Sequence, residues 1–150
     1  MKHLKLFFAL FAMLALGVTN AWAEEATLSF ADKAQRTSYS TTQQVWVQNG
    51  ITFTNNKASS TNNIADYAKP VRLYQNSEVI VSCGDLGNIT KIVFDCNSSS
   101  YATAMKNSIG TTATTSVSSD KVTVTLAGTS NSFTISKLTA QVRLDAITVT

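Results

Sequence analysis

Six residues of this chain have the side chains that a carbohydrate-binding surface needs. Flat aromatic rings stack on sugar faces, while amide and guanidinium groups can hydrogen-bond sugar hydroxyls. Side chains alternate between the two faces of a strand, so Trp46 lies on the opposite face from Val45 and Val47. The indole faces solvent if the valines face the core. The alternative, with Trp46 in the core and the valines outside, stays open. Arg72 and Tyr74 share one strand face after a polar loop. The predicted ligand-binding residues are Trp46, Asn55, Asn56, Tyr67, Arg72 and Tyr74.

The chain offers little for catalysis. Its one histidine, His3, lies in a segment that we expect to be removed, which leaves no Ser-His-Asp or Cys-His pair and no imidazole metal ligand. Turn and capping roles explain the acidic candidates for hydrolysis. These are Asp66, Asp85, Asp95, Asp120 and Asp145. We therefore predict no enzymatic activity and no catalytic cofactor, and only an acid pair in a cleft would favour hydrolysis.

The two cysteines are either a disulfide or two separate thiols. An even number in a secreted chain indicates a disulfide. However, Cys83 adjoins a predicted turn and Cys96 ends the returning strand, so a simple hairpin separates them by over ~20 Å. A disulfide needs Cα atoms within about 7 Å. We favour free buried thiols, with the Cys83–Cys96 disulfide as the open alternative.

The first 23 residues are typical of a cleaved secretory signal. Lys2 and Lys5 provide a charged start, residues 6–16 form an apolar run, and Ala21-Trp22-Ala23 gives a small-x-small cleavage site. The run is shorter than the roughly 20 residues of a membrane-spanning helix. We expect residues 24–150 to be secreted, at the cell surface or periplasmic, without a lipoprotein anchor, because the site precedes Glu24 rather than a cysteine.

The charge distribution argues against nucleic acid as a partner. The net charge of +3 falls to +1 without Lys2 and Lys5. The remaining basic residues are spread singly, without the cluster that nucleic-acid binding requires. No second long apolar run is present, so we also predict no membrane insertion of residues 24–150.

Alternation of apolar and polar residues dominates the chain and predicts half-buried β-strands. Asn49-Gly50, between two such segments, is a strong hairpin signal. The predicted strands span residues 27–31, 44–48, 51–55, 71–74, 78–83, 89–96, 114–118, 121–126, 132–136 and 142–150. Residues 24–150 therefore form one predicted all-β domain, a two-sheet antiparallel sandwich that is jelly-roll-like.

One segment departs from the strand pattern. Tyr101, Met105 and Ile109 recur every four residues, after serines that can cap a helix and before Gly110, which can end it. The sequence therefore predicts one short helix near residues 99–109.

Several segments together resemble secreted β-sandwich modules of gut Bacteroidota. They are Phe30, Gln44-x-Trp46-x-x-Asn49-Gly50-Ile51-Thr52-Phe53, Pro70-x-Arg72-x-Tyr74, Ile89-Thr90-Lys91-Ile92-Val93-Phe94 and Gln141-Val142-Arg143-Leu144-x-x-Ile147-Thr148-Val149. The resemblance covers nearly all of residues 24–150. It implies a fold similar to carbohydrate-binding jelly rolls, without an established ligand.

A structural calcium ion enters only through this resemblance. Residues 143–147 look similar to the closing strand of some carbohydrate-binding jelly rolls, in which an acidic residue and an acid near the N-terminus hold calcium. The similarity implies Asp145 as a ligand with Glu24 or Glu25. No Asp-x-Asp cluster supports the site, so a solvated Asp145 is the alternative.

Taken together, these features predict a secreted, non-catalytic binding module for an extracellular glycan. The alternative is a structural or adhesion protein of the cell surface that recruits a protein partner through exposed strand edges.

Overall fold

The computed structural model describes residues 24–150, which fold into two antiparallel β-sheets and one α-helix. The predicted all-β, two-sheet sandwich is confirmed, as is its single short helix. The predicted secretory signal lies in residues 1–23, outside the described residues. No helix within 24–150 has both the length and the apolar character needed to cross a membrane.

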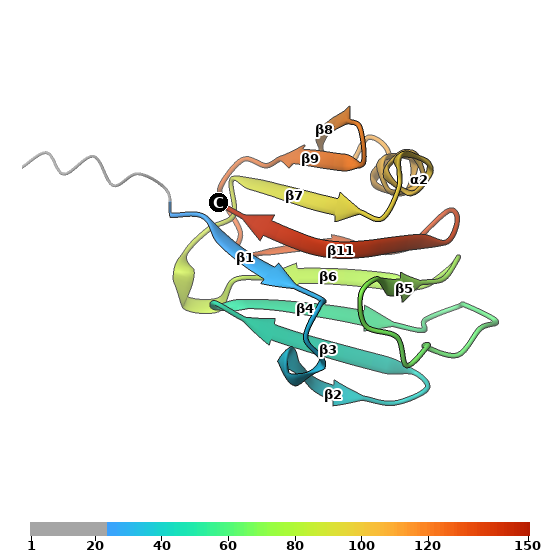
Figure 1. The fold of residues 1–150 in the computed structure, drawn as a ribbon. Helices are drawn as coiled ribbons and strands as arrows, with labels where there is room; N and C mark the ends of the chain where they lie inside the picture. Colours follow the sequence, from blue (N-terminus) through green and yellow to red (C-terminus); the bar gives the residue numbers. More distant parts are fainter. Residues whose placement is uncertain (1–23) are drawn as a thin grey trace, which may run out of the picture.

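The β11 sheet forms one layer (Figure 1). Its strands are β1 (Ala26–Ser29), β5 (Val71–Leu73), β7 (Lys91–Cys96), β8 (Thr114–Ser118), β9 (Lys121–Thr125) and β11 (Val142–Val149). They run in the order β1-β11-β7-β9-β8, and β5 pairs with the first residues of β11. The first strand of the domain therefore lies beside its last.

The β4 sheet forms the other layer, in the order β10-β6-β4-β3-β2. Its strands are β2 (Arg36–Tyr39), β3 (Gln43–Gln48), β4 (Ile51–Asn56), β6 (Glu78–Ser82) and β10 (Ser132–Ile135). β3 and β4 form the predicted hairpin. Asn49 and Gly50 both have positive φ angles, of 51° and 77°, as a two-residue type I′ turn requires.

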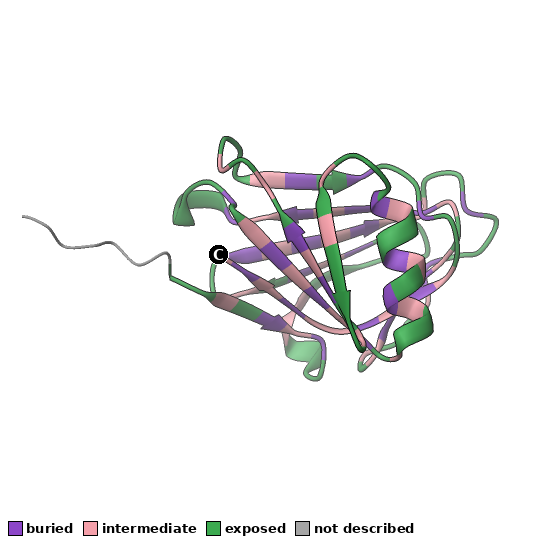
Figure 2. Cartoon of the chain, turned by 90° about the horizontal axis from the view of Figure 1, so that it is seen from above, coloured by how far each residue is buried: buried purple, intermediate pink, exposed green. Residues whose placement is uncertain are grey.

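Buried residues alternate with more exposed ones along most strands, whereas the edge strands β2 and β8 have no buried residue (Figure 2). At the centre of the sandwich Phe30 contacts Trp46 and Phe53 edge-on, with ring centroids 5.2 Å and 4.9 Å apart. Such edge-to-face pairs add to the stabilisation from buried apolar area. The core therefore contains the indole of Trp46, which was predicted to bind a ligand.

The helix α2 (Ser99–Ile109) forms where the sequence predicts it. The Ser98 hydroxyl accepts a hydrogen bond from the Tyr101 amide at the N-cap, and Gly110 ends the helix with a φ of 58°. Ala102, Met105 and Ile109 are buried against the β11 sheet, and α2 lies near the beginning of β11 (Figure 1).

The predicted hairpin between residues 78–83 and 89–96 is wrong. β6 belongs to the β4 sheet and β7 to the β11 sheet, and the connection through the 3₁₀ helix η2 (Gly84–Leu86) crosses between layers. Cys83 and Cys96 are nevertheless free and buried, so the favoured prediction is confirmed and the disulfide alternative is wrong. The reason given for free thiols, the separation of Cys83 and Cys96 in a hairpin, does not hold, because β6 and β7 do not pair.

The 3₁₀ helix η1 (Lys33–Gln35) and strand β2 were not predicted. Three of the four β2 residues are exposed, so its sequence carries little apolar alternation. β2 forms because its backbone pairs with β3 at the edge of the β4 sheet.

Candidate functional site

Trp46 is fully buried, so its predicted role as a stacking surface for a ligand is wrong. Trp46 does lie on the opposite face of β3 from Val45 and Val47, but it is the indole face that is buried. Gln44 and Trp46 point into the core, and the two valines lie on the outer face. The indole buries more apolar area than either valine, and its N–H donates to Gln44 Oε1 at 3.1 Å. The core therefore satisfies the only polar atom of the indole.

The two predicted asparagines also do not form an open ligand site. Asn55 is fully buried opposite Gln44 in the β3–β4 ladder, which contradicts its predicted ligand-binding role. Asn56 is on the outer face of the β4 sheet, where it accepts from Gln43 and donates to Glu78 at 2.8 Å and 2.7 Å. These hydrogen bonds use Asn56 as a link between neighbouring strands.

Tyr67 and Arg72 do come together. The Arg72 guanidinium carbon lies 4.3 Å from the centroid of the Tyr67 ring, in cation–π geometry. Arg72 lies on the outer face of β5 between the buried residues Val71 and Leu73. Tyr67 is half-exposed, with 50% of its surface accessible. Tyr74 follows β5 on the Arg72 side by alternation, but its side chain forms no hydrogen bond or ring stack with Tyr67 or Arg72.

The structure adds two residues that the sequence reasoning missed, Arg143 and Tyr101. Arg143 on β11 pairs directly with Arg72 on β5, and its guanidinium carbon lies 5.5 Å from the Tyr101 ring centroid. Tyr67, Arg72, Arg143 and Tyr101 therefore cross β5, β11 and the start of α2; we call these four residues the arginine row. The two arginines lie 71 residues apart in the chain but share one surface.

A repeated tripeptide could have signalled this pairing. The sequence Val-Arg-Leu occurs at residues 71–73 and again at 142–144. The two copies pair antiparallel, so each valine opposes a leucine and the arginines oppose each other. In both copies the apolar residues face the core and the arginine faces out.

The other Tyr–Arg stack has a different electrostatic environment. Arg36 lies 4.4 Å from the Tyr39 ring centroid, and it also forms an ion pair with Asp66. Hydrogen bonds from Arg36 and then Lys33 lower the pKa of the Asp66 carboxyl group. Arg72 and Arg143 differ from Arg36, because neither forms an ion pair with a described carboxylate.

The implied calcium pair of Glu25 and Asp145 does not assemble. Asp145 is the unpaired residue at a register shift in β11, near the end of β1, whereas Glu25 lies beside Thr150. Five strand positions at ~3.3 Å each separate them by about 16 Å. Glu25 instead forms an ion pair with Lys91, and Asp145 accepts from Asn97. Residues 24–150 contain no cluster of three or more side chains suited to a metal ion.

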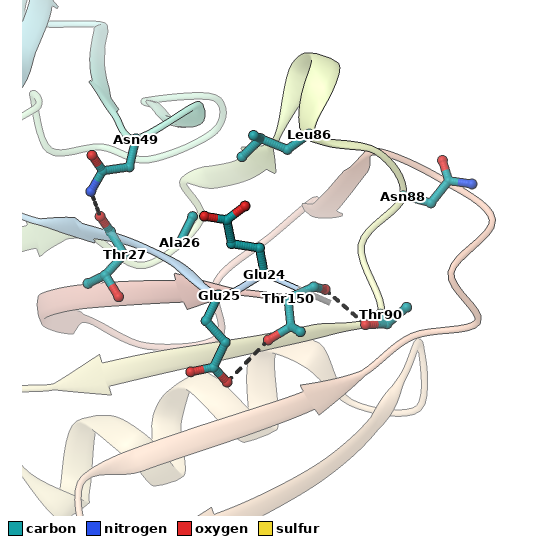
Figure 3. A pocket seen from close by; sticks show the side chains of 9 residues that line it. All are labelled: Glu24, Glu25, Ala26, Thr27, Asn49, Leu86, Asn88, Thr90 and Thr150. Carbon is teal, nitrogen blue, oxygen red and sulfur yellow. Dashed lines mark hydrogen bonds between the residues drawn. The ribbon is translucent and has the colours of Figure 1, made fainter. Parts of the chain in front are cut away.

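A polar hollow of about 370 Å³ lies at the C-terminal end of β11, whereas the arginine row lies at its beginning (Figure 3). Glu24 and Glu25 line it, but their carboxylates point away from each other. The Lys91 hydrogen bond lowers the pKa of Glu25 and keeps its carboxylate occupied. The hollow therefore lacks the converging acid pair that glycoside hydrolysis requires.

The arginine row brings two guanidinium groups and two tyrosine rings together on one surface. Comparisons with protein-family models, curated proteins and solved structures give no match, so its function is argued from its own chemistry.

Proposed function

We propose that residues 24–150 form a non-catalytic binding module for an extracellular glycan, with Tyr67 and Arg72 at the centre of the site. The observation that supports this proposal is the half-exposed Tyr67 ring held by a guanidinium. One ring face contacts the cation, and the exposed part can stack on a pyranose ring. Arginine and tyrosine also offer donors for sugar hydroxyls.

The loop that carries Tyr67 is fastened to the sandwich on both sides. The Ile64 amide donates to Thr41 O at 2.8 Å, and Tyr39 donates to Ile64 O at 3.1 Å. The Lys69 amide donates to Phe30 O at 3.0 Å. A prepositioned aromatic ring loses little conformational entropy when a ligand binds, which favours recognition by a small surface.

Replacing Tyr67 with alanine tests this role. We expect Tyr67→Ala to weaken binding of the preferred glycan by about 5-fold, because a stacked ring contributes on the order of 1 kcal/mol. Tyr67→Phe keeps the ring and should retain most of the affinity. Isothermal titration calorimetry of residues 24–150 against a glycan panel, with circular dichroism to verify folding, measures both effects.

Two results would contradict the proposal. One is that no glycan in the panel binds the folded wild-type protein. The other is that Tyr67→Ala binds as tightly as wild type. Leu86→Ala provides a control, because Leu86 is also an exposed apolar residue, at 59%, and lies by the polar hollow at the other end of β11.

A second candidate function, recruitment of another copy of this chain, is favoured by the edge strand β8. All but one of its five residues are exposed, and its sequence Thr-Thr-Ser-Val-Ser has no charge or proline to discourage strand addition. This candidate predicts concentration-dependent association in sedimentation velocity, and Val117→Lys should abolish it. A monomer at all concentrations would exclude this self-association.

A further inference from the structure

Arg72 and Arg143 form a like-charge pair, and neither arginine forms an ion pair within the described residues. They are direct partners in the β5–β11 ladder, a position that places Cβ atoms about 4.5–5.5 Å apart. Like charges at such positions destabilise a sheet. The nearby Asp145 carboxylate is hydrogen-bonded to Asn97 and forms no ion pair with Arg143.

The guanidinium groups also keep donors free. A cation–π contact uses the flat face of a guanidinium and leaves its in-plane N–H groups available. Neither the Arg72 nor the Arg143 guanidinium donates a hydrogen bond within the described residues; Arg143 Nε is itself buried without a partner, as is Arg36 Nη1, so the terminal N–H groups are those that can meet a ligand. Arg36 stacks in a similar way on Tyr39, but it donates to Asp66. The difference points to an acceptor supplied from outside the chain.

We propose that the arginine row binds an anionic group of an acidic polysaccharide, a carboxylate or a sulfate ester, between Arg72 and Arg143. This inference rests on the proposed glycan-binding function and specifies its ligand class. The anion accepts N–H donors from both guanidinium groups and relieves their mutual repulsion. The sugar ring that bears it packs on Tyr67.

The selectivity comes from this local pair, because residues 24–150 carry a net charge of only +1. A long-range cationic field is therefore absent, and binding should depend on the position of the two guanidinium groups. Acidic sugars satisfy two requirements together, an anion for the arginines and a ring for Tyr67. An acidic peptide satisfies only the first.

The test compares oligogalacturonate with its methyl ester, which has the same backbone without the charge. A carrageenan oligosaccharide supplies sulfate without carboxylate, and poly-glutamate of similar length supplies carboxylate without a sugar ring. We expect calorimetry to show at least 10-fold tighter binding of one acidic oligosaccharide than of the methyl ester, weakened by added salt. Which acidic oligosaccharide binds identifies the anion.

Arg72→Gln and Arg143→Gln should each weaken this binding by about 10- to 100-fold, as expected for the loss of a charge-assisted hydrogen bond. Their melting temperatures should equal or exceed that of wild type, because each substitution removes the repulsion. Lys91→Gln is the matched control: it removes one charge from the same sheet, beside Glu25, and should leave binding unchanged.

Each remaining outcome overturns a specific part of the argument. Equal binding of the methyl ester would overturn the anionic ligand and leave the proposed glycan function standing. Equal binding of poly-glutamate would overturn the sugar component. Failure of all these oligosaccharides and of the neutral glycan panel would overturn both proposals. Acidic binding that survives both arginine substitutions would place the site elsewhere.

Discussion

Replacing Trp46 with alanine is expected to lower the free energy of unfolding of residues 24–150 by about 3–5 kcal/mol, the usual cost of truncating a buried tryptophan. The indole is fully buried and lies edge-on to Phe30 at 5.2 Å. Its removal leaves a cavity and takes away the N–H donor of Gln44 Oε1. Urea unfolding followed by far-ultraviolet circular dichroism measures the loss, because the variant has no tryptophan within these residues.

Trp46→Phe is the matched variant and should lose less stability than Trp46→Ala. It retains an aromatic ring against Phe30 but leaves Gln44 Oε1 without the indole donor. Wild-type Trp46 should also emit at short wavelength and resist quenching by acrylamide, before and after a glycan is added. An alanine variant of wild-type stability would contradict the buried placement and restore Trp46 as a surface residue.

The Trp46 result shows what strand alternation can and cannot predict. Alternation identifies the residues that share a face, and it correctly separated Trp46 from Val45 and Val47. It does not identify the face that is buried when both sets are partly apolar. Here the choice depends on Phe30, which follows β1 and packs edge-on against the indole, and on Phe53 of β4, which packs against Phe30.

The individual strands and the helix were easier to predict than the pairing of the strands into sheets. The Asn49-Gly50 turn and the capped helix depend on local backbone chemistry, so short segments of sequence were enough to predict them. The assignment of β6 and β7 to different sheets depends on packing between distant segments. β2 depends on a neighbouring strand more than on its own residues.

The candidate site shows the same limit. Parity grouped Arg72 with Tyr74 on one strand face, and Tyr67 was among the predicted ligand-binding residues, but nothing local brings Arg143 beside Arg72. That contact joins segments about 70 residues apart in the chain. The repeated Val-Arg-Leu tripeptide is consistent with the pairing, yet only the β5–β11 register establishes it. Long-range strand pairing is therefore the information that the sequence reasoning lacked.

The two thiols should be nearly unreactive in the native protein. Burial, and then the carboxylates of Asp95, Asp120 and Asp145, raise the pKa of Cys96 from 9.0 to about 12. Burial also raises the pKa of Cys83, whose Sγ donates to Gly87 O at 2.9 Å. Since the thiolate is the reactive form, three pKa units lower the reactive fraction of Cys96 by about 10³-fold below pH 9.

Alkylation with iodoacetamide at pH 8, followed by mass spectrometry of peptides, measures each cysteine separately. We expect Cys96 to react at least 10³-fold more slowly in the native protein than in urea, and Cys83 to be slowed to a smaller extent. In urea both should be alkylated without a reductant, because neither is in a disulfide. A mass two hydrogens lower before alkylation, or equal native and unfolded rates, would contradict free buried thiols.

The same pKa shift predicts how stability depends on alkaline pH. The folded state holds the Cys96 proton more tightly than the unfolded state, because its pKa is raised to about 12. The stabilisation is therefore fully present below the ordinary cysteine value and declines as pH rises from about 9 toward 12. Cys96→Ala should flatten this decline in urea unfolding between pH 8 and pH 11. Cys83→Ala should flatten the decline less. An identical pH profile for Cys96→Ala and wild type would show that the pKa of the Cys96 thiol does not change on unfolding.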